Sequence, residues 1–148
     1  MKLRWATFKT TRFEHKTPGP HFINPNCFGE DVAIWLRPAL VTAGFDPSEP
    51  IQEDYGWGLW TRSGSDPYWI AISVIPEDGS ADEAEWGIGI AYDPGLDLFK
   101  RLFHRPREAD SLRVSAAVDA ALKADPSIRE VEWWLGEPHR GSPSAVPK

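Results

Sequence analysis

The sequence predicts an α+β fold, a two-layer sandwich in which two helices cover one face of an antiparallel sheet of about five strands. Three observations lead to this class. Apolar residues alternate with period two in three neighbouring segments, recur about every 3.6 residues in two others, and short polar turns separate the segments. The elements follow the order β-α-β-β-β-α-β. We expect residues 1–138 to form a single domain with one core.

The first helix is predicted over residues 29–44, after a loosely alternating strand at 3–14 and a loop at 16–29 that is rich in proline, glycine and asparagine. Gly44 is suited to the C′ position of this helix. Pro38 predicts a kink, because its nitrogen cannot donate to the carbonyl one turn earlier. The apolar stripe of the helix consists of Val32, Trp35, Leu36, Ala39, Leu40 and Ala43.

A three-stranded antiparallel meander is predicted over residues 54–62, 68–75 and 85–93, where the apolar pattern changes to period two. Residues 63–67 form a short turn of the kind that joins hairpin strands. Alternate residues share a face, so the bulky side chains of the second and third strands should lie together against the helices. These side chains are Tyr68, Ile70, Ile72, Val74, Trp86, Ile88, Ile90 and Tyr92.

The opposite face of the meander receives Trp69 beside small residues, which include Gly87 and Gly89. Two interpretations of this shallow floor are open. The glycines lie beneath an overlying tryptophan or face water, or else the floor is a concave apolar surface that takes a partner or a ligand. Trp133 and Trp134 are adjacent, so one of them must also point away from the core.

The C-terminal part of the chain predicts a helical turn at 96–104, a helix at 106–124 and a last strand at 128–135. Pro106 is suited to the N1 position of that helix. Residues 139–148 have no periodicity, and we expect them to form a disordered tail. Nothing in the pattern fixes the places of the first and last strands in the sheet.

Charge and cysteine content exclude several classes of protein. The net charge is −6, with a net of +4 over residues 1–16 and −11 over residues 38–99, which argues against non-specific binding of nucleic acid. The one cysteine, Cys27, excludes an internal disulfide and favours a reducing compartment. The first residues lack the apolar stretch of a secretory signal, and no run is long enough to span a bilayer. We therefore expect a cytoplasmic protein with no membrane partner.

No strong catalytic motif is present, and we expect a non-enzymatic protein without a cofactor. Two weaker arrangements stay open at this point. His15 and His21 with Glu30 or Asp31 would form a metal site, and Cys27 with His21 would form a nucleophile and its base.

Carboxylates gather near the meander. In an antiparallel meander, the segment that enters the first strand and the loop after the second strand lie at the same end of the sheet. Glu53 and Asp54 are neighbours that point to opposite sides, which disfavours a glycosidase pair. The gathered carboxylates are Asp46, Glu49, Glu53, Asp54, Glu77, Asp78, Asp82, Glu83 and Glu85.

This acidic end is either a solvated rim or a docking site for a basic protein, with Tyr55 and Trp57 as aromatic anchors. The second interpretation predicts binding residues on the first two strands of the meander and on the loop that follows. These residues are Glu53, Asp54, Tyr55, Trp57, Trp60, Trp69, Asp82 and Glu83.

The segments FGEDVAIWL, EDYGWGLW and EWGIGI, within about residues 22–92, resemble small uncharacterised bacterial α+β domains, some of which resemble toxin-immunity proteins. The resemblance implies an acidic, non-enzymatic protein that binds one basic toxin. The leading hypothesis is therefore a protein-binding domain with a basic partner. The alternative is a small enzyme or ligand-binding domain that uses the open sheet face. The sequence is also compatible with a homo-oligomer.

Overall fold

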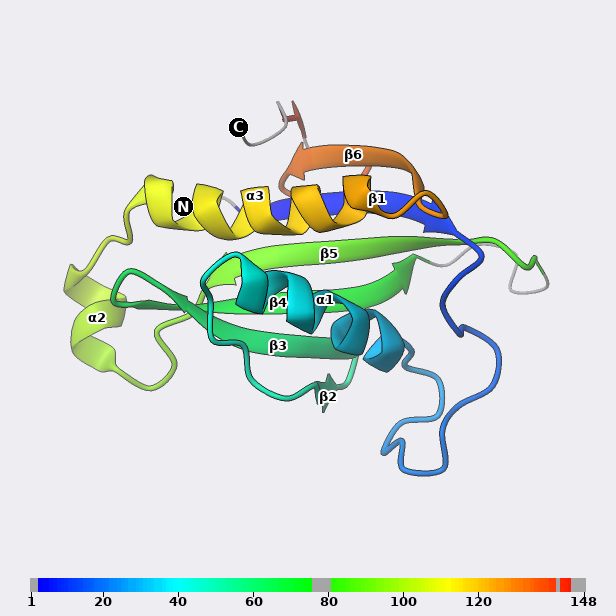
Figure 1. Ribbon diagram of the computed structural model, residues 1–148. Helices are drawn as coiled ribbons and strands as arrows, with labels where there is room; N and C mark the ends of the chain where they lie inside the picture. The colour runs from blue at the N-terminus through cyan, green and yellow to red at the C-terminus, as the bar shows by residue number, and fades with distance from the viewer. Residues whose placement is uncertain (1–2, 76–80, 141, 145–148) are drawn as a thin grey trace.

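An antiparallel sheet forms one layer of the computed structural model, which describes residues 3–75, 81–140 and 142–144 (Figure 1). Its seven strands follow the order β2-β3-β4-β5-β1-β6-β7, and each neighbouring pair is antiparallel. The predicted α+β class is confirmed, with short strands at both edges in addition to the expected five. The strands are β1 (Arg4–Thr10), β2 (Ile51–Glu53), β3 (Gly56–Ser63), β4 (Asp66–Ile75), β5 (Ala84–Tyr92), β6 (Arg129–Leu135) and β7 (Ser142–Pro143).

Two helices, α1 (Glu30–Thr42) and α3 (Glu108–Ala124), lie on the same face of the sheet and contact each other (Figure 1). Both match the predicted helices to within a few residues. Gly44 follows α1 with φ +95°, the left-handed conformation expected at C′. A third helix, α2 (Leu98–Phe103), projects at one end of the sheet and buries none of its residues. No helix among the described residues has the length and apolar character needed to cross a membrane.

The core lies between the sheet and the two covering helices. Ile70, Ile72, Trp86 and Ile88 are fully buried, and they belong to one cluster with Leu36 and the other buried residues of the helices. This confirms the assignment of the bulky face of the meander to the helices. The register places these side chains in rows, because Ile70 pairs with Ile90 and Ile72 pairs with Ile88.

The structure places the first and last strands, which the sequence pattern could not. β1 lies between β5 and β6, so the N-terminus completes the centre of the sheet. On β6, Trp133 enters the core, where its Nε1 donates to Asp119 Oδ1 at 2.9 Å. Trp134 points to the other face, as the adjacency of the two residues required.

Three local predictions differ from the structure. The strand expected at 54–62 is present as β3 but begins two residues later. Glu53 of β2 pairs with Gly56 of β3, and the two residues between them form a tight turn. Arg107 is the N-cap of α3, so Pro106 lies just before the helix and not at N1.

The segment expected as a disordered tail also contacts the sheet, where it is described. β7 pairs with β6, and Ser144 N donates to Trp133 O at 2.9 Å. Residues 141 and 145–148 lie outside the described residues, as do 76–80.

Candidate functional site: the open face of the sheet

The face of the sheet opposite α1 and α3, here called the open face, carries four half-buried tryptophans. The strand register aligns one row of side chains across six strands. Trp134 pairs with Trp5, Trp5 with Gly89, and Gly89 with Ala71, while Ala71 pairs with Gly58 and Gly58 with Ile51. Small residues in the middle of this row leave room for large aromatic rings from neighbouring positions. The four tryptophans are Trp5, Trp60, Trp69 and Trp134.

Two indole rings lie directly over the glycines of this row. A Cβ at Gly58 would lie 2.2 Å from the ring of Trp69, and a Cβ at Gly89 would lie 2.7 Å from the ring of Trp5. Trp5 also reaches Gly87, where the corresponding distance is 3.3 Å. The interpretation in which the glycines lie beneath a tryptophan is therefore confirmed. The floor predicted from the sequence is a surface covered by indoles.

Five of the eight predicted binding residues meet at the β2–β3 corner of the open face. Trp69 Nε1 donates to the Tyr55 hydroxyl, and the rings of Trp69 and Trp60 lie 5.1 Å apart. Tyr55 is half exposed, and burial of its hydroxyl raises its pKa, with the charges of Glu53 and Asp93 adding to the effect. The hydroxyl therefore stays protonated at neutral pH.

The carboxylates at this corner are free to meet a partner. Glu53 and Asp54 are exposed, and neither forms an ion pair with any other residue that the structure describes. With Tyr55 between the two strands, these residues form what is here called the acidic corner. It presents two negative charges beside three aromatic side chains in contact, those of Tyr55, Trp69 and Trp60.

Trp57 does not belong to this site, and its prediction as an exposed anchor is wrong. Alternation along β3 turns it to the helix side, where only 5% of its surface is exposed. Its Nε1 donates to Cys27 O at 3.0 Å, and its ring lies 5.0 Å from that of Phe22. The loop before α1 thus packs over Trp57, an arrangement that local alternation along β3 could not reveal.

Asp82 and Glu83 lie at the start of β5 but are neutralised within the chain. Lys16 Nζ lies 2.9 Å from Asp82 Oδ1, and Arg129 forms a two-pronged ion pair with Glu83. These contacts lower the pKa of both carboxyls, so both stay charged and paired. Lys16 and Arg129 therefore reduce the unpaired negative charge at the acidic end that the sequence predicted.

The other predicted carboxylates are also dispersed. Ser48 N donates to Trp60 O at 2.8 Å, which places Asp46 and Glu49 along the middle of β3 and away from its start. Glu85 is buried and binds His139. Glu77 and Asp78 lie outside the described residues.

Sequence reasoning did not place Trp5 on the open face, and it left open whether Trp133 or Trp134 would lie there. Trp134 Nε1 donates to Thr7 Oγ1 at 3.0 Å, and its ring lies 5.0 Å from the ring of His139. The alternation along the first strand already indicated that Leu3, Trp5 and Thr7 share one face. Only the pairing of β1 with β5 and β6 shows that this face is the open one.

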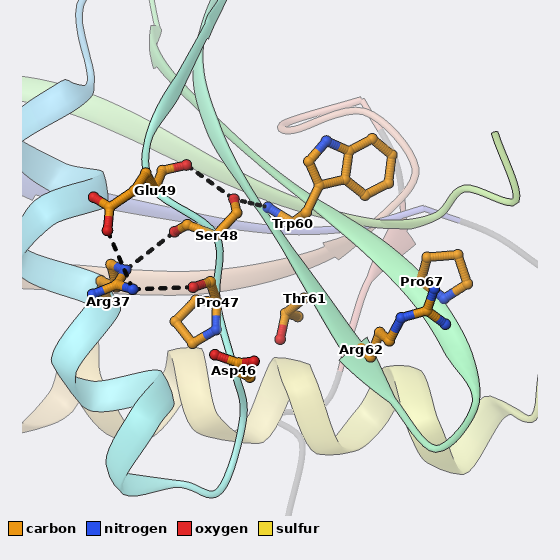
Figure 2. A pocket seen from close by; sticks show the side chains of 9 residues that line it. All are labelled: Arg37, Asp46, Pro47, Ser48, Glu49, Trp60, Thr61, Arg62 and Pro67. Atoms are coloured by element: carbon orange, nitrogen blue, oxygen red, sulfur yellow. Dashed lines mark hydrogen bonds and ion pairs between the residues drawn. The ribbon is translucent and has the colours of Figure 1, made fainter.

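A cleft of about 600 Å³ borders the open face at Trp60 (Figure 2). Arg37 of α1 forms its far wall by donating to Ser48 O at 3.2 Å and to Pro47 O at 3.3 Å. Asp46 and Arg62 face this cleft, and neither forms an ion pair within the described part of the chain. The cleft is lined by Arg37, Asp46, Pro47, Ser48, Glu49, Trp60, Thr61, Arg62 and Pro67.

The structure disfavours both of the weaker chemical arrangements. His21 Nε2 lies 2.6 Å from Glu30 Oε2, while His15 bonds Ala81 O at 2.8 Å. Within residues 3–75, 81–140 and 142–144, no three His, Cys, Asp or Glu side chains could hold a metal ion together. Cys27 donates to Asp54 O, and burial raises the pKa of its thiol, which disfavours a nucleophilic thiolate.

A buried polar cluster at the far end of the meander was not predicted. His104 Nε2 lies within 3.0 Å of both carboxylate oxygens of Asp66, and the rings of Tyr92 and His104 are 6.1 Å apart. The Tyr68 and Tyr92 hydroxyls in this cluster are buried without a hydrogen-bond partner among the described residues. No local pattern indicates this cluster, because its members are far apart along the chain.

Comparison of the chain with family models, with curated proteins and with solved structures gives no match.

Proposed function

We propose that this chain is a non-enzymatic protein-binding domain that docks a basic protein on its open face, beside the acidic corner. One observation carries the proposal. Four half-buried tryptophans cover a sheet face without a helix, and the two carboxylates next to them, Glu53 and Asp54, have no ion pair with a described residue. Large apolar patches with a polar rim are typical of protein interfaces.

The chemistry of the surface favours lysine- or arginine-rich partners. Indole faces bind guanidinium and ammonium groups through cation–π contacts, and tryptophan is enriched among residues that dominate binding energy. The carboxylates of the acidic corner would attract the same groups over a longer range. If the resemblance to toxin-immunity proteins holds, the partner is a basic toxin.

The experiment compares two variants that remove the same amount of charge. Glu53→Gln/Asp54→Asn changes the acidic corner, and Asp82→Asn/Glu83→Gln changes carboxylates that are paired within the chain. Each is tested for its association rate with the basic protein that the wild-type chain captures from its cells of origin, or with the product of a neighbouring gene. We expect the first variant to associate roughly 3–10-fold more slowly at low salt and to lose most of its salt dependence.

The control variant should associate at nearly the wild-type rate. An equal fall in the association rate of both variants would show that only net charge matters. Unchanged rates in both, with folding intact by circular dichroism, would reduce the acidic corner to a solubilising surface. Either result would contradict the proposal.

A second candidate function, binding of a small ligand, is favoured by the cleft beside Trp60. Its volume is in the range of small-molecule sites, and Arg62 offers a cation without an ion pair in the described chain. A thermal-shift screen with phosphate, citrate and nucleotides tests it. A rise in melting temperature that is lost in Arg62→Gln would support this candidate, whereas no rise with any compound would remove it.

A further inference from the structure

The segment 96–107, here called the α2 segment, exposes large apolar side chains to solvent. Leu96 is 94% exposed, and the four large apolar residues of α2 are each between 68% and 73% exposed. α2 buries none of its residues. Single exposed apolar residues are ordinary, but a contiguous group of this size marks an interaction surface. The four residues of α2 are Leu98, Phe99, Leu102 and Phe103.

The apolar side chains of α2 form one continuous ridge. Leu98 and Leu102 are four residues apart, as are Phe99 and Phe103, so both pairs lie on the same side of the helix. The rings of Phe99 and Phe103 are 5.2 Å apart. Lys100 and Arg101 occupy the other side. The helix is therefore amphipathic, with its apolar side turned outward.

The cations of the α2 segment are unpaired. Lys100, Arg101, Arg105 and Arg107 form no ion pair in the described structure, and Asp97 is the one carboxylate among residues 97–107. Asp97 is engaged as the N-cap, since its side chain accepts from Lys100 N at 3.0 Å. Outside the segment, Arg62 is the one described lysine or arginine without an ion pair.

The α2 segment also lies at the end of the sheet away from the acidic corner. It follows the end of β5, where Tyr92 pairs with Tyr68 near the start of β4, whereas the acidic corner is next to the start of β3. His104 binds Asp66 at the start of β4 and so fixes the base of the segment to the sheet. The molecule therefore has a cationic, apolar end and an anionic end, which would orient it on a negatively charged surface.

We propose that the α2 segment binds the surface of an anionic lipid bilayer, with its leucines and phenylalanines in the interface and its cations at the headgroups. A projecting ridge flanked by long cationic side chains has the shape for insertion between lipids, whereas an acidic protein would need a groove to receive it. The expectation of no membrane partner rested on the lack of a run long enough to span a bilayer, whereas α2 would lie on the bilayer surface. This inference is independent of the proposed function.

Vesicle co-sedimentation of the full chain tests the proposal. The vesicles are equal parts phosphatidylcholine and phosphatidylglycerol, or phosphatidylcholine alone. We expect binding to the anionic vesicles at low salt and little binding to the neutral ones. Phe99→Ser/Phe103→Ser should lower the partition coefficient about tenfold or more. Its matched control, Ile34→Ser/Val41→Ser, removes two exposed apolar side chains of α1 and should bind like the wild type.

A second pair of variants tests the charges. Lys100→Gln/Arg101→Gln should weaken binding to anionic vesicles, whereas Arg113→Gln/Arg140→Gln, which removes two cations elsewhere, should not. The proposal is overturned if the wild type does not bind anionic vesicles, or if each variant binds as its control does. Concentration-dependent self-association that Phe99→Ser/Phe103→Ser abolishes, without vesicle binding, would also overturn it and assign the ridge to a second copy of the chain.

Discussion

The Tyr68 hydroxyl is buried without a hydrogen-bond partner among the described residues. Burial raises its pKa to about 12, and the charges of Asp110, Asp66 and Tyr92 add to the effect. Because this pKa lies above the ordinary value of 10.0, the folded state holds the proton more tightly than the unfolded state does. The resulting stability is complete below pH 10 and is lost as the pH rises toward about 12.

Tyr68→Phe removes this buried hydroxyl and keeps the ring. We expect stability at neutral pH to be unchanged or slightly higher, since no hydrogen bond to a described group is lost. Between pH 10 and pH 12 the variant should lose less stability than the wild type, because one group no longer titrates. Urea denaturation at several pH values measures both effects. If the free energy of unfolding of Tyr68→Phe fell as steeply with pH as that of the wild type, the alkaline loss would not come from the Tyr68 hydroxyl.

Ile88 is fully buried in the centre of the core, between β4 and β1. Ile88→Ala should lower the free energy of unfolding by about 2–5 kcal/mol, as is typical when a buried isoleucine is truncated to alanine. Ser73→Ala on the open face is the control and should change it by less than about 0.5 kcal/mol. Denaturation midpoints measure both, and an unchanged midpoint for Ile88→Ala would mean that the faces of the meander are reversed.

At the scale of elements, strong periodicity predicted α1, α3 and the three central strands, because burial of one face imposes a repeat on the sequence. β2 and β7 were missed, since strands of three and two residues are too short to show a repeat. The placement of β1 beside β5 also could not be predicted. It joins segments some eighty residues apart, and no local pattern records that pairing.

The α2 segment shows a related limit. Its helical spacing was visible in the sequence, and a helical turn was expected at 96–104. Periodicity reveals an apolar stripe but does not tell whether another element covers it. Only the structure shows that Phe99 and Phe103 face solvent, while the similar stripe of α3 is covered through Val114 and Val118.

The fit of indole rings over glycines in the open face can be tested at Gly89. In Gly89→Ala the new methyl group would lie within 2.8 Å of three ring atoms of Trp5, so the ring must shift. We expect a loss of about 1–3 kcal/mol in the free energy of unfolding and a change in tryptophan fluorescence. Ala91→Gly, one position along on the same face of β5, is a control without a clash. Wild-type stability for Gly89→Ala would show that Trp5 does not rest on the glycine.

At the scale of the whole molecule, ion pairs neutralise several of the charges that are separated along the sequence. The basic N-terminal segment pairs with acidic residues, through Arg12 with Asp125 at 2.7 Å and Lys16 with Asp82 at 2.9 Å. The sequence predicted nine carboxylates at one end of the sheet. It could not show that Asp46 and Glu49 would lie along the middle of β3, nor that cations of the chain would pair with others of the set. What remains at that end for a partner is the acidic corner at Glu53 and Asp54.

The central claim is that a basic partner docks on the open face, and the indole N–H signals of the eight tryptophans test it most directly. Four tryptophans lie on the open face and four on the helix side, so the chain contains its own control. An arginine hexapeptide serves as the probe, and the signals are followed by nuclear magnetic resonance. The open-face set is Trp5, Trp60, Trp69 and Trp134, and the helix-side set is Trp35, Trp57, Trp86 and Trp133.

We predict that the peptide shifts the open-face signals, most strongly those of Trp60 and Trp69 beside the acidic corner, and leaves the helix-side signals in place. Glu53→Gln/Asp54→Asn should weaken these shifts, because it removes the two carboxylates that attract the peptide. Shifts spread equally over both sets, shifts confined to the helix side, or no shift at any peptide concentration would contradict the account.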